Sequence, residues 1–436
     1  MVNKTIEAMF FSKRSHPEIV HKIATILMNH YNFLTIECVK ENEIYVYEDG
    51  IYAEKGRMVL KKEIEKICGS FVRTNIVNEV IAKVERNTLI ERENMVKAPI
   101  EELCINNGVL NLKTRVLTPH TPDKVFIRKL PLNYKIGLES SIFTQFLEET
   151  LDEKDIKLMQ EWFGFCLWRK YHEKKALIMI GPRDTGKTVL LNTLTNFIGK
   201  NNISSVDLHE MGNNNFAIER MYEKYVNIND ELTSDDLRDV SKFKKLTGGS
   251  VMTAEPKFKT AFSFYSFSKL VYATNKMPTL KGTMEDPESF YSRWIIFLFD
   301  NIVAEDDKNK NLVDDINTPK EMSGILNWAL DGLDILIKNG KFSEYNTWED
   351  NEKIMKSSGK SVYSFIANVV KNEFEGYVSN ECLYKTYFEW CSLNSKDPEN
   401  KNTFGKKFKP SFGKRVTDGV RNGWSGIKLD EVLLKL

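Results

Sequence analysis

The stretch ALIMIGPRDTGKT, residues 176–188, constrains the fold of this chain more strongly than any other part of its sequence. Its first five residues are apolar and predict a buried β-strand. The next eight match the pattern GxxxxGK followed by Ser or Thr, which joins a strand to the first turn of a helix. The chain is therefore expected to contain a sheet with a glycine-rich loop at one edge.

This loop has the composition of a phosphate-binding loop. Glycines let the backbone N–H groups wrap around phosphates, and the N-terminus of the following helix adds a favourable electrostatic field. Lys187 is expected to reach the β- and γ-phosphates and Thr188 to coordinate Mg²⁺. The alternative is a structural glycine-rich turn. The predicted nucleotide-binding residues are Gly181, Pro182, Arg183, Asp184, Thr185, Gly186, Lys187 and Thr188.

Four more short apolar runs follow the loop and predict four more buried strands. They cover residues 202–206, 225–229, 269–274 and 294–299, and helical segments lie between several of them. Short apolar strands that alternate with helices are typical of a mostly parallel sheet covered by helices. The predicted fold class is therefore α/β.

Two of these predicted strands end in polar residues suited to phosphate chemistry. Asp230 and Glu231 follow one strand, and Asn275 follows another. Parallel strands place their C-terminal ends at one edge of a sheet, so we expect these residues beside the phosphate loop. One carboxylate can hold Mg²⁺ and its neighbour can orient the attacking water, while the amide can sense the γ-phosphate. Solvated turns are the alternative for all three residues.

Arg293 directly precedes the last apolar run, in FYSRWIIFLF. An arginine beside a nucleotide can neutralise charge in the transition state, often from a neighbouring subunit, although a solvated strand start is the alternative. The predicted catalytic residues are Lys187, Asp230, Glu231, Asn275 and Arg293, and the predicted metal ligands are Thr188 and Asp230.

Taken in order, the segments GPRDTGKT, VNINDEL, KKLTGGSVMTAEPKFKTAFSF, KLVYATNKMP and SRWIIFLF resemble the motifs of superfamily 3 helicases. The resemblance is to the phage and plasmid primase–helicases related to the poxvirus NTPase-primase, and it extends from near residue 100 to residue 436. It implies an AAA+-like P-loop ATPase core that forms a ring, usually a hexamer, and translocates on single-stranded DNA. By position, the resemblance implies that Lys187 and Thr188 are the Walker A pair and that Asp230 and Glu231 are the Walker B acids. It also implies that Asn275 is the motif C sensor and that Arg293 is the arginine finger.

One segment of this resemblance is expected to contact DNA. Residues 245–259 resemble the family's B′ region, whose hairpin lines the central channel, and this implies phosphate contacts for Lys257 and Lys259. Exposed hairpin lysines without such a role are the alternative. The sequence departs from the family at Ser250, where relatives have an acidic residue after the paired glycines. Whatever that acid supports in relatives is not expected here.

Residues 1–137 are predicted to form an N-terminal α/β domain, ahead of an ATPase domain at 138–340. Residues 17–31 place apolar side chains at helical spacing, and Asp49-Gly50 and Asn107-Gly108 are turn signals between short strand-like runs. The first 135 residues show no cluster of acidic metal ligands of the kind a primase needs. The chain is therefore predicted to lack a primase domain, and a separate primase or polymerase would then be a partner.

Residues 358–436 are predicted to form a winged-helix DNA-binding domain. Helical patterns at 362–374 and 383–391 precede two short strands around a turn at Asn422-Gly423, and the tail is rich in lysine and arginine. A solvated basic face over an aromatic core is the alternative. The predicted DNA contacts are Lys406, Lys407, Lys409 and Trp424, whereas Phe404, Phe408 and Phe412 are expected in the core.

Composition excludes some classes of protein. The chain has 62 Lys and Arg against 61 Asp and Glu, so any DNA-binding surface has to be local. No run approaches the roughly 20 apolar residues of a membrane span, and the N-terminus lacks the pattern of a signal peptide. We therefore expect a soluble, cytoplasmic protein without membrane contacts. The six cysteines lack zinc-ligand spacing and are expected to be reduced core residues.

The sequence thus predicts an ATP-dependent, ring-forming DNA helicase that serves replication of a virus, phage or mobile element. Its partners would be single-stranded and forked DNA and further copies of the chain. Two alternatives remain open: an ATPase that remodels or packages DNA without unwinding it, and an origin-binding initiator whose ATPase drives assembly.

Overall fold

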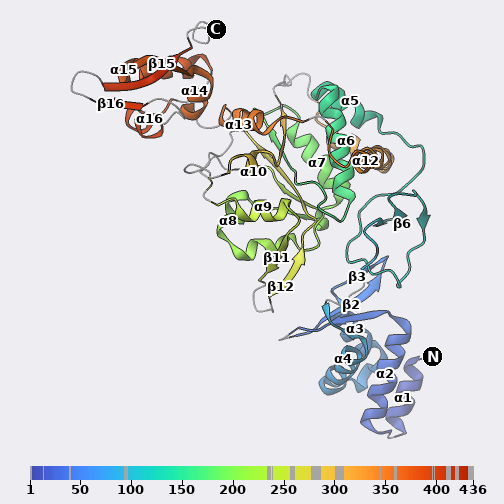
Figure 1. The fold of residues 1–436 in the computed structure, drawn as a ribbon. Helices are drawn as coiled ribbons and strands as arrows, with labels where there is room; N and C mark the ends of the chain where they lie inside the picture. The colour runs from blue at the N-terminus through green and yellow to red at the C-terminus, as the bar shows by residue number, and fades with distance from the viewer. Residues whose placement is uncertain are drawn as a thin grey trace.

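The computed structural model describes residues 2–12, 14–38, 41–92, 97–232, 237, 239–255, 261–275, 286–299, 309–343, 345–357, 361–394, 396, 398–408, 414–417 and 422–430. Within these ranges the chain is a mixed α/β protein, which confirms the predicted class at this level. Figure 1 shows three parts in chain order, with the N-terminal part and the C-terminal part on different sides of a central sheet.

The N-terminal part packs helices against a small sheet. Its elements are α1 (Val2–Phe11), α2 (His16–His30), β1 (Phe33–Ile36), β2 (Glu43–Glu48), β3 (Ile51–Ala53), α3 (Gly56–Cys68), α4 (Thr74–Thr88) and β4 (Leu89–Ile90). The strand order is β3-β2-β1-β4. The predicted helix at 17–31 is confirmed as α2. The turn at Asp49-Gly50 is also confirmed, since both residues have positive φ, 51° and 88°, as a two-residue hairpin turn requires.

A second small sheet contains β5 (Glu102–Ile105), β6 (Gly108–Asn111) and β7 (Leu117–Thr118). The predicted turn at Asn107-Gly108 is wrong by one residue, because Ile105 pairs with Gly108 and the turn consists of residues 106 and 107. A side chain at Gly108 would lie 2.5 Å from a carbonyl oxygen of β7, so this glycine serves strand packing. Leu103 and Leu110 share a hydrophobic core with the helices beyond residue 140, so packing continues across the predicted boundary near residue 137.

The central sheet is parallel throughout and confirms the predicted buried strands. It contains β8 (Ala176–Ile180), β9 (Ile203–Ser204), β10 (Val226–Asn229), β13 (Lys269–Thr274) and β14 (Trp294–Leu298). The strand order is β14-β8-β13-β10-β9. Leu177 and Met179 point into one hydrophobic core and Ile178 into another, so β8 is buried on both faces and its sequence is apolar without alternation.

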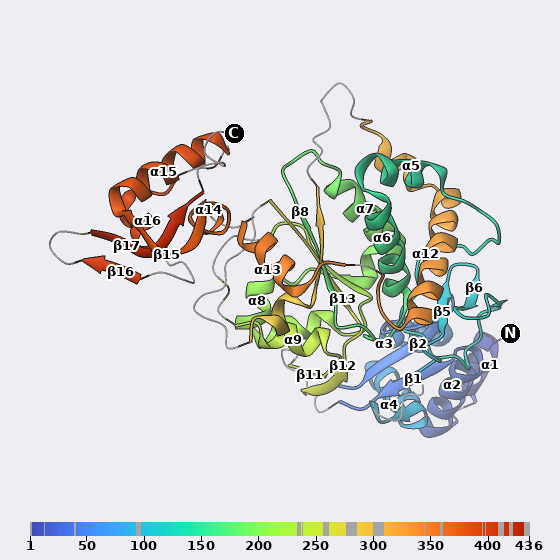
Figure 2. The same ribbon diagram turned by 45° about the horizontal axis from the view of Figure 1, so that its top comes forward.

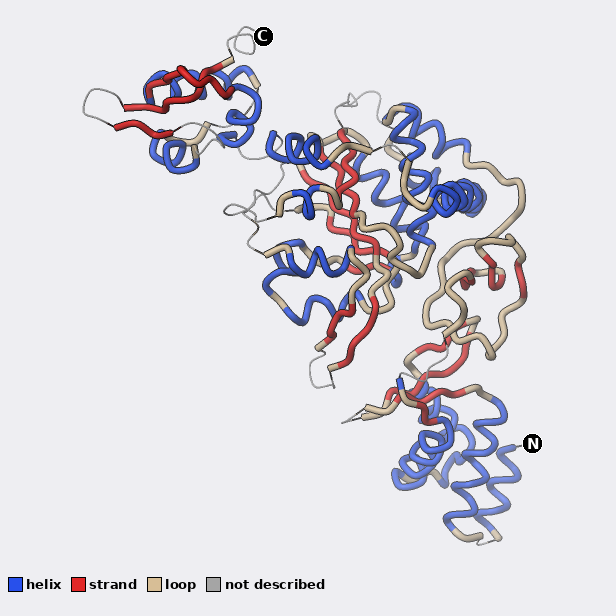
Figure 3. Tube along the Cα trace, viewed as in Figure 1, coloured by secondary structure: helices blue, strands red, loops and turns tan. Residues whose placement is uncertain are grey.

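Helices cover both faces of this sheet (Figures 2 and 3). One face carries α5 (Ser141–Thr150), α6 (Glu153–Leu167), α7 (Lys187–Ile198) and α12 (Pro319–Asn339), with α11 (Leu312–Ile316) against α5 and α7. The other carries α8 (Leu208–Asn213), α9 (Ser241–Thr247), α10 (Glu288–Tyr291) and α13 (Trp348–Ser357). Helix α13 lies in a polar stretch of the sequence that did not predict a helix. Its Met355 is buried in the second core, so tertiary packing stabilises it.

A separate two-stranded hairpin extends from the second face. It pairs β11 (Val251–Ala254) with β12 (Phe262–Tyr265) in antiparallel register. Met252 and Ala254 are buried in the core, whereas Val251 and Tyr265 are exposed. The hairpin therefore has one anchored and one open face.

The C-terminal part has its own hydrophobic core. Its elements are α14 (Ser361–Val369), β15 (Val370–Ser379), α15 (Asn380–Leu393), α16 (Lys401–Lys407), β16 (Lys414–Thr417) and β17 (Asn422–Leu429), with strand order β15-β17-β16. Phe404 and Phe408 are buried here, as predicted, and Phe412 lies outside the described residues.

Two predictions for this part are wrong. The helical pattern at 362–374 ends at Val369, because Val370 pairs with Leu429 and continues as strand β15. The turn signal at Asn422-Gly423 lies inside β17, where these residues pair with Thr417 and Val416. The connection between β16 and β17 is instead residues 418–421, outside the described ranges.

Two expectations from composition can be compared with the structure. Helices long and apolar enough to cross a membrane are not found in the described ranges. Four cysteines are buried as expected, but Cys38 is intermediate and Cys382 is exposed at the start of α15, outside its apolar stripe.

Candidate functional site

The glycine-rich loop joins the C-terminal end of β8 to the first turn of α7. The backbone N–H of Gly181 donates to the carbonyl of Thr274 at 3.3 Å, which ties the loop to the neighbouring strand β13. A side chain at Gly181 would lie 2.1 Å from the carbonyl oxygen of Phe299. Gly186 has φ 90°, a left-handed conformation, where it precedes the helix. The local shape of the loop therefore depends on both glycines.

The side chain of Lys187 folds back onto the loop. Its Nζ donates to the carbonyl oxygen of Gly181 at 2.8 Å, to the carbonyl of Pro182, and to the hydroxyl of Thr185 at 3.3 Å. Burial lowers the pKa of this ammonium, because the charged form loses solvation. The ammonium lies among neutral oxygens, in the concave side of a loop whose shape suits an anion.

A cavity of about 980 Å³ opens on this loop at the C-terminal edge of the sheet. Residues 183–188 of the loop line it, and so do Asp230 and Glu231 after β10 and Asn275 after β13. The structure thus brings together five predicted residues: Lys187, Thr188, Asp230, Glu231 and Asn275. Gly181 and Pro182 accept the hydrogen bonds of Lys187 beneath the cavity. Parallel strand direction explains why these distant segments meet.

One wall of the cavity carries residues that the sequence did not reveal. Helix α5 and the segment around α11 supply Ile142, Gln145, Phe146, Glu149, Thr150, Asn309, Lys310 and Leu312. The apolar members of this set form a surface beside the polar loop, as in pockets that hold a flat organic group next to its charged substituent. Their local sequence has no turn or glycine signal, so only the three-dimensional arrangement identifies them.

A buried carboxylate holds that wall in place. Glu321 of α12 is 3% exposed and accepts hydrogen bonds from the backbone N–H groups of Ile142 and Phe143, at 3.1 and 3.2 Å. Ser140, the residue before α5, makes no side-chain cap of its own. Glu321 therefore satisfies the N-terminus of α5 from a distant part of the sequence.

The oxygen atoms near the loop fit a magnesium ion. Thr188 and Asp230 supply a hydroxyl and a carboxylate, and Mg²⁺ is usually held by one or two protein oxygens together with waters and phosphates. Within the described ranges, no group of three or more His, Cys, Asp or Glu side chains forms a ready metal site. The donor set therefore suits a metal that arrives with a phosphate ligand.

Arg293 does not line the cavity of its own chain. Its carbonyl accepts from the N–H of Ala176, which places it at the opposite, N-terminal edge of the sheet. Its guanidinium donates to the hydroxyl of Thr247 at 3.0 Å and to the carbonyl of Ser289, and burial lowers its pKa. Within one chain the structure does not bring Arg293 to Lys187.

The predicted DNA-contacting residues are only partly described. Lys257, Lys259 and Lys409 lie outside the described residues, and Lys406 and Lys407 belong to helix α16. Trp424 lies within β17, not at a hairpin tip, and its ring contacts Phe408 with the centroids 5.3 Å apart. Trp424 is therefore partly committed to the C-terminal core.

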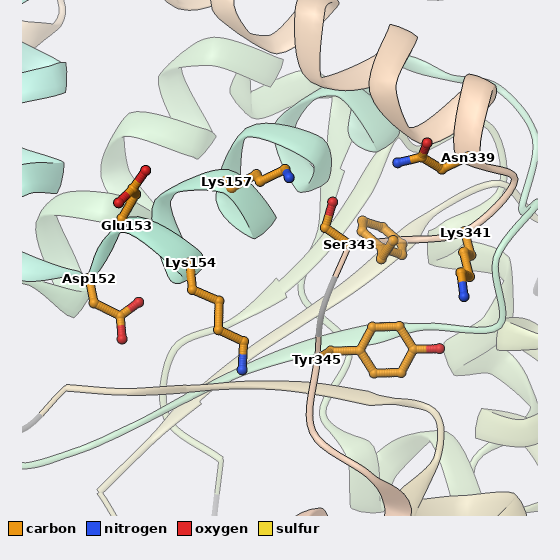
Figure 4. Close-up of a pocket in the computed structure, with 9 residues that line it drawn as sticks. Asp152, Glu153, Lys154, Lys157, Asn339, Lys341, Ser343 and Tyr345 are labelled. Atoms are coloured by element: carbon orange, nitrogen blue, oxygen red, sulfur yellow. The ribbon is translucent and has the colours of Figure 1, made fainter.

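A second cavity, of about 920 Å³, lies where the start of α6 meets the segment after α12 (Figure 4). Lys154, Lys157, Lys341 and Tyr345 line it together with acidic residues of the α6 N-terminus. None of the predicted site residues belongs to it. Its mixture of both charges does not point to one class of ligand.

Two protein families match parts of the chain. Residues 16–152 match a family described as D5 N terminal like, and residues 179–293 match a family of unknown function, DUF5906. The second match begins within β8 and ends at Arg293, so it contains the loop and every strand-end residue of the cavity. No curated protein matches the chain.

Solved structures resemble the chain over most of its length. The A form apo structure of the NrS-1 C-terminal region has a TM-score of 0.50 and 12% identity, covering 89% of this chain and 83% of that one. A further apo structure of the same region has a TM-score of 0.45 and 11% identity, covering 93% and 98%. At 12% identity the first likeness shows a shared fold.

Proposed function

We propose that this chain is an ATP-dependent DNA helicase of the superfamily 3 type, which works as a ring of identical subunits during replication of a virus, phage or mobile element. The observation that carries the proposal is the cavity that joins the loop at residues 183–188 to Asp230, Glu231 and Asn275 at one edge of a parallel sheet. Nucleotides bind at this edge in open α/β sheets. The strand order β14-β8-β13-β10-β9 supports the AAA+-like core that the sequence resemblance implies.

In this proposal, the loop binds the triphosphate of ATP. The backbone N–H groups of the loop and the N-terminus of α7 face the phosphates, and Lys187 exchanges its bonds to loop carbonyls for bonds to the β- and γ-phosphate oxygens. The base and ribose lie against the wall made by α5, where Phe146 and Leu312 offer apolar contact. Binding thus uses the whole cavity.

The strand-end residues then prepare hydrolysis. Thr188 and Asp230 would hold Mg²⁺, which neutralises charge on the phosphate oxygens when bound. Glu231 orients the attacking water and takes up its proton, and Asn275 contacts the γ-phosphate. Arg293 completes the site of a neighbouring subunit, which accounts for its distance from the cavity of its own chain.

The hairpin of β11 and β12 is proposed to transmit this cycle to DNA. It extends from the same domain, and its predicted contacts Lys257 and Lys259 would track the phosphate backbone without reading sequence. Separation of a duplex follows when successive subunits pull one strand through the ring. A separate primase or polymerase would be the partner that supplies synthesis.

The C-terminal part supports a second candidate, an origin-binding initiator whose ATPase drives assembly. Its order of helix, strand, two helices and a final antiparallel pair supports the proposed winged helix, in which α16 would be the recognition helix. Helix α16 includes Lys406 and Lys407. Sequence-specific duplex binding by the intact chain, unaffected by Lys187→Ala, would favour this candidate.

A forked-duplex unwinding assay tests the main proposal. The wild type is expected to separate strands with ATP and Mg²⁺, and Lys187→Ala is expected to lose both unwinding and hydrolysis. Lys154→Ala is the matched control, because Lys154 lines the second cavity. Robust ATP hydrolysis by the wild type without any strand separation would refute the helicase.

A mixture of Arg293→Ala and Lys187→Ala subunits tests the shared site. Each variant alone is expected to be inactive, whereas mixed rings contain some sites with both residues intact. ATP hydrolysis should therefore reappear in the mixture. If the mixture is no more active than either variant alone, Arg293 does not act across an interface.

A further inference from the structure

Arg92, at the end of the N-terminal part, reaches the β11–β12 hairpin at the end where its two strands are connected. Its guanidinium carbon lies 4.6 Å from the centroid of the Phe262 ring, the first residue of β12, and 6.0 Å from that of Tyr222. One of its nitrogens is 3.5 Å from the Tyr222 hydroxyl. A residue of the N-terminal part thus contacts an element more than 160 positions later in the sequence.

The guanidinium is fixed in this position by an acid. Arg92 Nη2 donates to Glu43 Oε2 at 2.7 Å, and the same oxygen accepts from the hydroxyl of Tyr45 at 3.1 Å. The side chains of Arg92 and Glu43 are only 21% and 9% exposed. Because Glu43 and Tyr45 belong to strand β2, the position of Arg92 is set by the N-terminal sheet.

The aromatic residues that Arg92 contacts form a cluster under the hairpin. Tyr222 packs edge-on against Phe262 and Phe264, with ring centroids 4.9 and 5.2 Å apart. Phe264 is buried, whereas Phe262 is only partly buried. Tyr222 and Arg92 therefore both support Phe262, together with the neighbouring ring of Phe264, whose centroid lies 6.0 Å away.

A second contact from the N-terminal side reaches the same place. Lys97 forms an ion pair with the buried carboxylate of Glu223, and Arg128 donates to the carbonyl of Glu223 at 3.2 Å. Lys97 also lies 5.4 Å from the ring centroid of Tyr222. Basic residues that precede the central sheet thus hold both Tyr222 and Glu223.

A two-stranded ribbon is marginally stable by itself, so its direction depends on the residues that its strands pack against. We propose that Arg92 is a positioning residue: held by Glu43, it supports Phe262 and so fixes the direction in which β11 and β12 extend from the central sheet. In Figures 1 and 2, the hairpin extends on the side of the central sheet that faces the N-terminal part. The consequence for DNA rests on the proposed function, because the hairpin is the element proposed to grip the strand. The N-terminal part then controls how strongly DNA binding accelerates ATP hydrolysis.

Hydrogen exchange of the full chain tests the positioning role without ATP or DNA. In Arg92→Ala, amides of β11 and β12 are expected to exchange about 2- to 30-fold faster than in the wild type, the range between an exposed and a desolvated cation–π contact. The matched control is Arg86→Ala, which removes an exposed arginine at the end of α4. Equal exchange of the hairpin in Arg92→Ala and in the wild type would overturn the proposal.

Two further variants separate positioning from general stability. Arg92→Lys keeps a charge for Glu43 but loses the flat face over Phe262, and Phe262→Leu keeps apolar volume but loses the ring. Both are expected to loosen the hairpin while the melting temperature of the chain stays near that of the wild type. The Arg92→Lys change should have little additional effect on exchange in a Phe262→Leu background. Additive effects of the two changes would contradict a direct contact.

ATPase rates with and without single-stranded DNA test the consequence. Arg92→Ala and Arg92→Lys are expected to keep the basal rate and to lose most of the stimulation by DNA. If the hairpin loosens but the wild type shows no DNA stimulation, the proposed function fails and the positioning role stands. If the wild type is stimulated and Arg92→Ala is stimulated equally, the coupling role of the N-terminal part is refuted.

Discussion

Replacing Glu321 should loosen helix α5, which forms one wall of the cavity. Glu321→Ala removes the acceptor for the N–H groups of Ile142 and Phe143. Ile142 is 37% exposed, so water can reach its N–H, whereas Phe143 is fully buried and its N–H would lose its partner. One buried donor without a partner costs about 1–3 kcal/mol, and loss of the negative charge at the helix N-terminus adds up to about 1 kcal/mol.

The expected loss is thus about 2–3 kcal/mol of local stability, which corresponds to about 30- to 160-fold faster hydrogen exchange at the first turn of α5. Glu321→Gln retains an acceptor oxygen without the charge and should accelerate exchange only about fivefold, for a loss near 1 kcal/mol. Lys320→Ala, at the exposed neighbouring position of α12, should change it less than about twofold.

The same variants carry a functional readout. Gln145, Phe146 and Thr150 line the cavity from α5, so the Michaelis constant for ATP should rise in Glu321→Ala while the turnover number changes little. Two outcomes would show that the Glu321 carboxylate does not cap α5. Hydrogen exchange at Phe143 could accelerate less than threefold in Glu321→Ala, or it could accelerate equally in Glu321→Ala and Glu321→Gln.

Three further predictions concern other parts of the chain. Gly181→Ala should abolish nucleotide binding and destabilise the central part by about 2–4 kcal/mol, because the new methyl group would lie 2.1 Å from a carbonyl oxygen. Gly405→Ala is the control, because nothing lies within 4 Å of the new methyl group, and it should change neither the melting temperature nor a nucleotide titration. Burial lowers the pKa of Lys269 to about 7, so above that pH the unfolded chain binds more protons than the folded chain. The free energy of unfolding should therefore rise between about pH 7 and pH 10, by at most about 1.4 kcal/mol per pH unit. Melting curves of Lys269→Met should lack this rise. Phe408→Ala should destabilise the C-terminal part by about 3–5 kcal/mol and expose it to proteases, whereas Phe374→Ala, at a side chain 94% exposed, should leave its protease resistance unchanged.

Strands β8 and β13 of the central sheet were predictable because both are buried on both faces. Such strands are apolar without alternation, so KLVYAT predicts β13 at its observed bounds. The meeting of Asp230 and Asn275 beside Lys187 was also predictable, since it requires only that the strands run parallel. Parallel direction, not local sequence, determines the polar half of the site.

The remaining features depend on contacts that no local pattern encodes. Phe146 lines the cavity because Glu321, far along the chain, orients α5. Val370 continues the helical spacing of α14, yet pairing with Leu429 makes it the first residue of a strand. Asn422-Gly423 has the composition of a turn, but the register of β16 against β17 places the connection earlier. In each of these cases, tertiary pairing overrides local preference.

The hydrogen bonds that Lys187 makes to its own loop also bear on which anions the site would admit. The carbonyls of Gly181 and Pro182 compete with any incoming ligand for the same ammonium protons. A small anion such as sulfate can bond to the ammonium and the loop amides, but it has no second charged group to offer to the strand-end side of the cavity. Under the proposed function, a triphosphate and its Mg²⁺ would contact the ammonium, the loop amides and the strand-end residues together. Under the proposed function, the loop is therefore expected to discriminate by ligand reach as well as by charge.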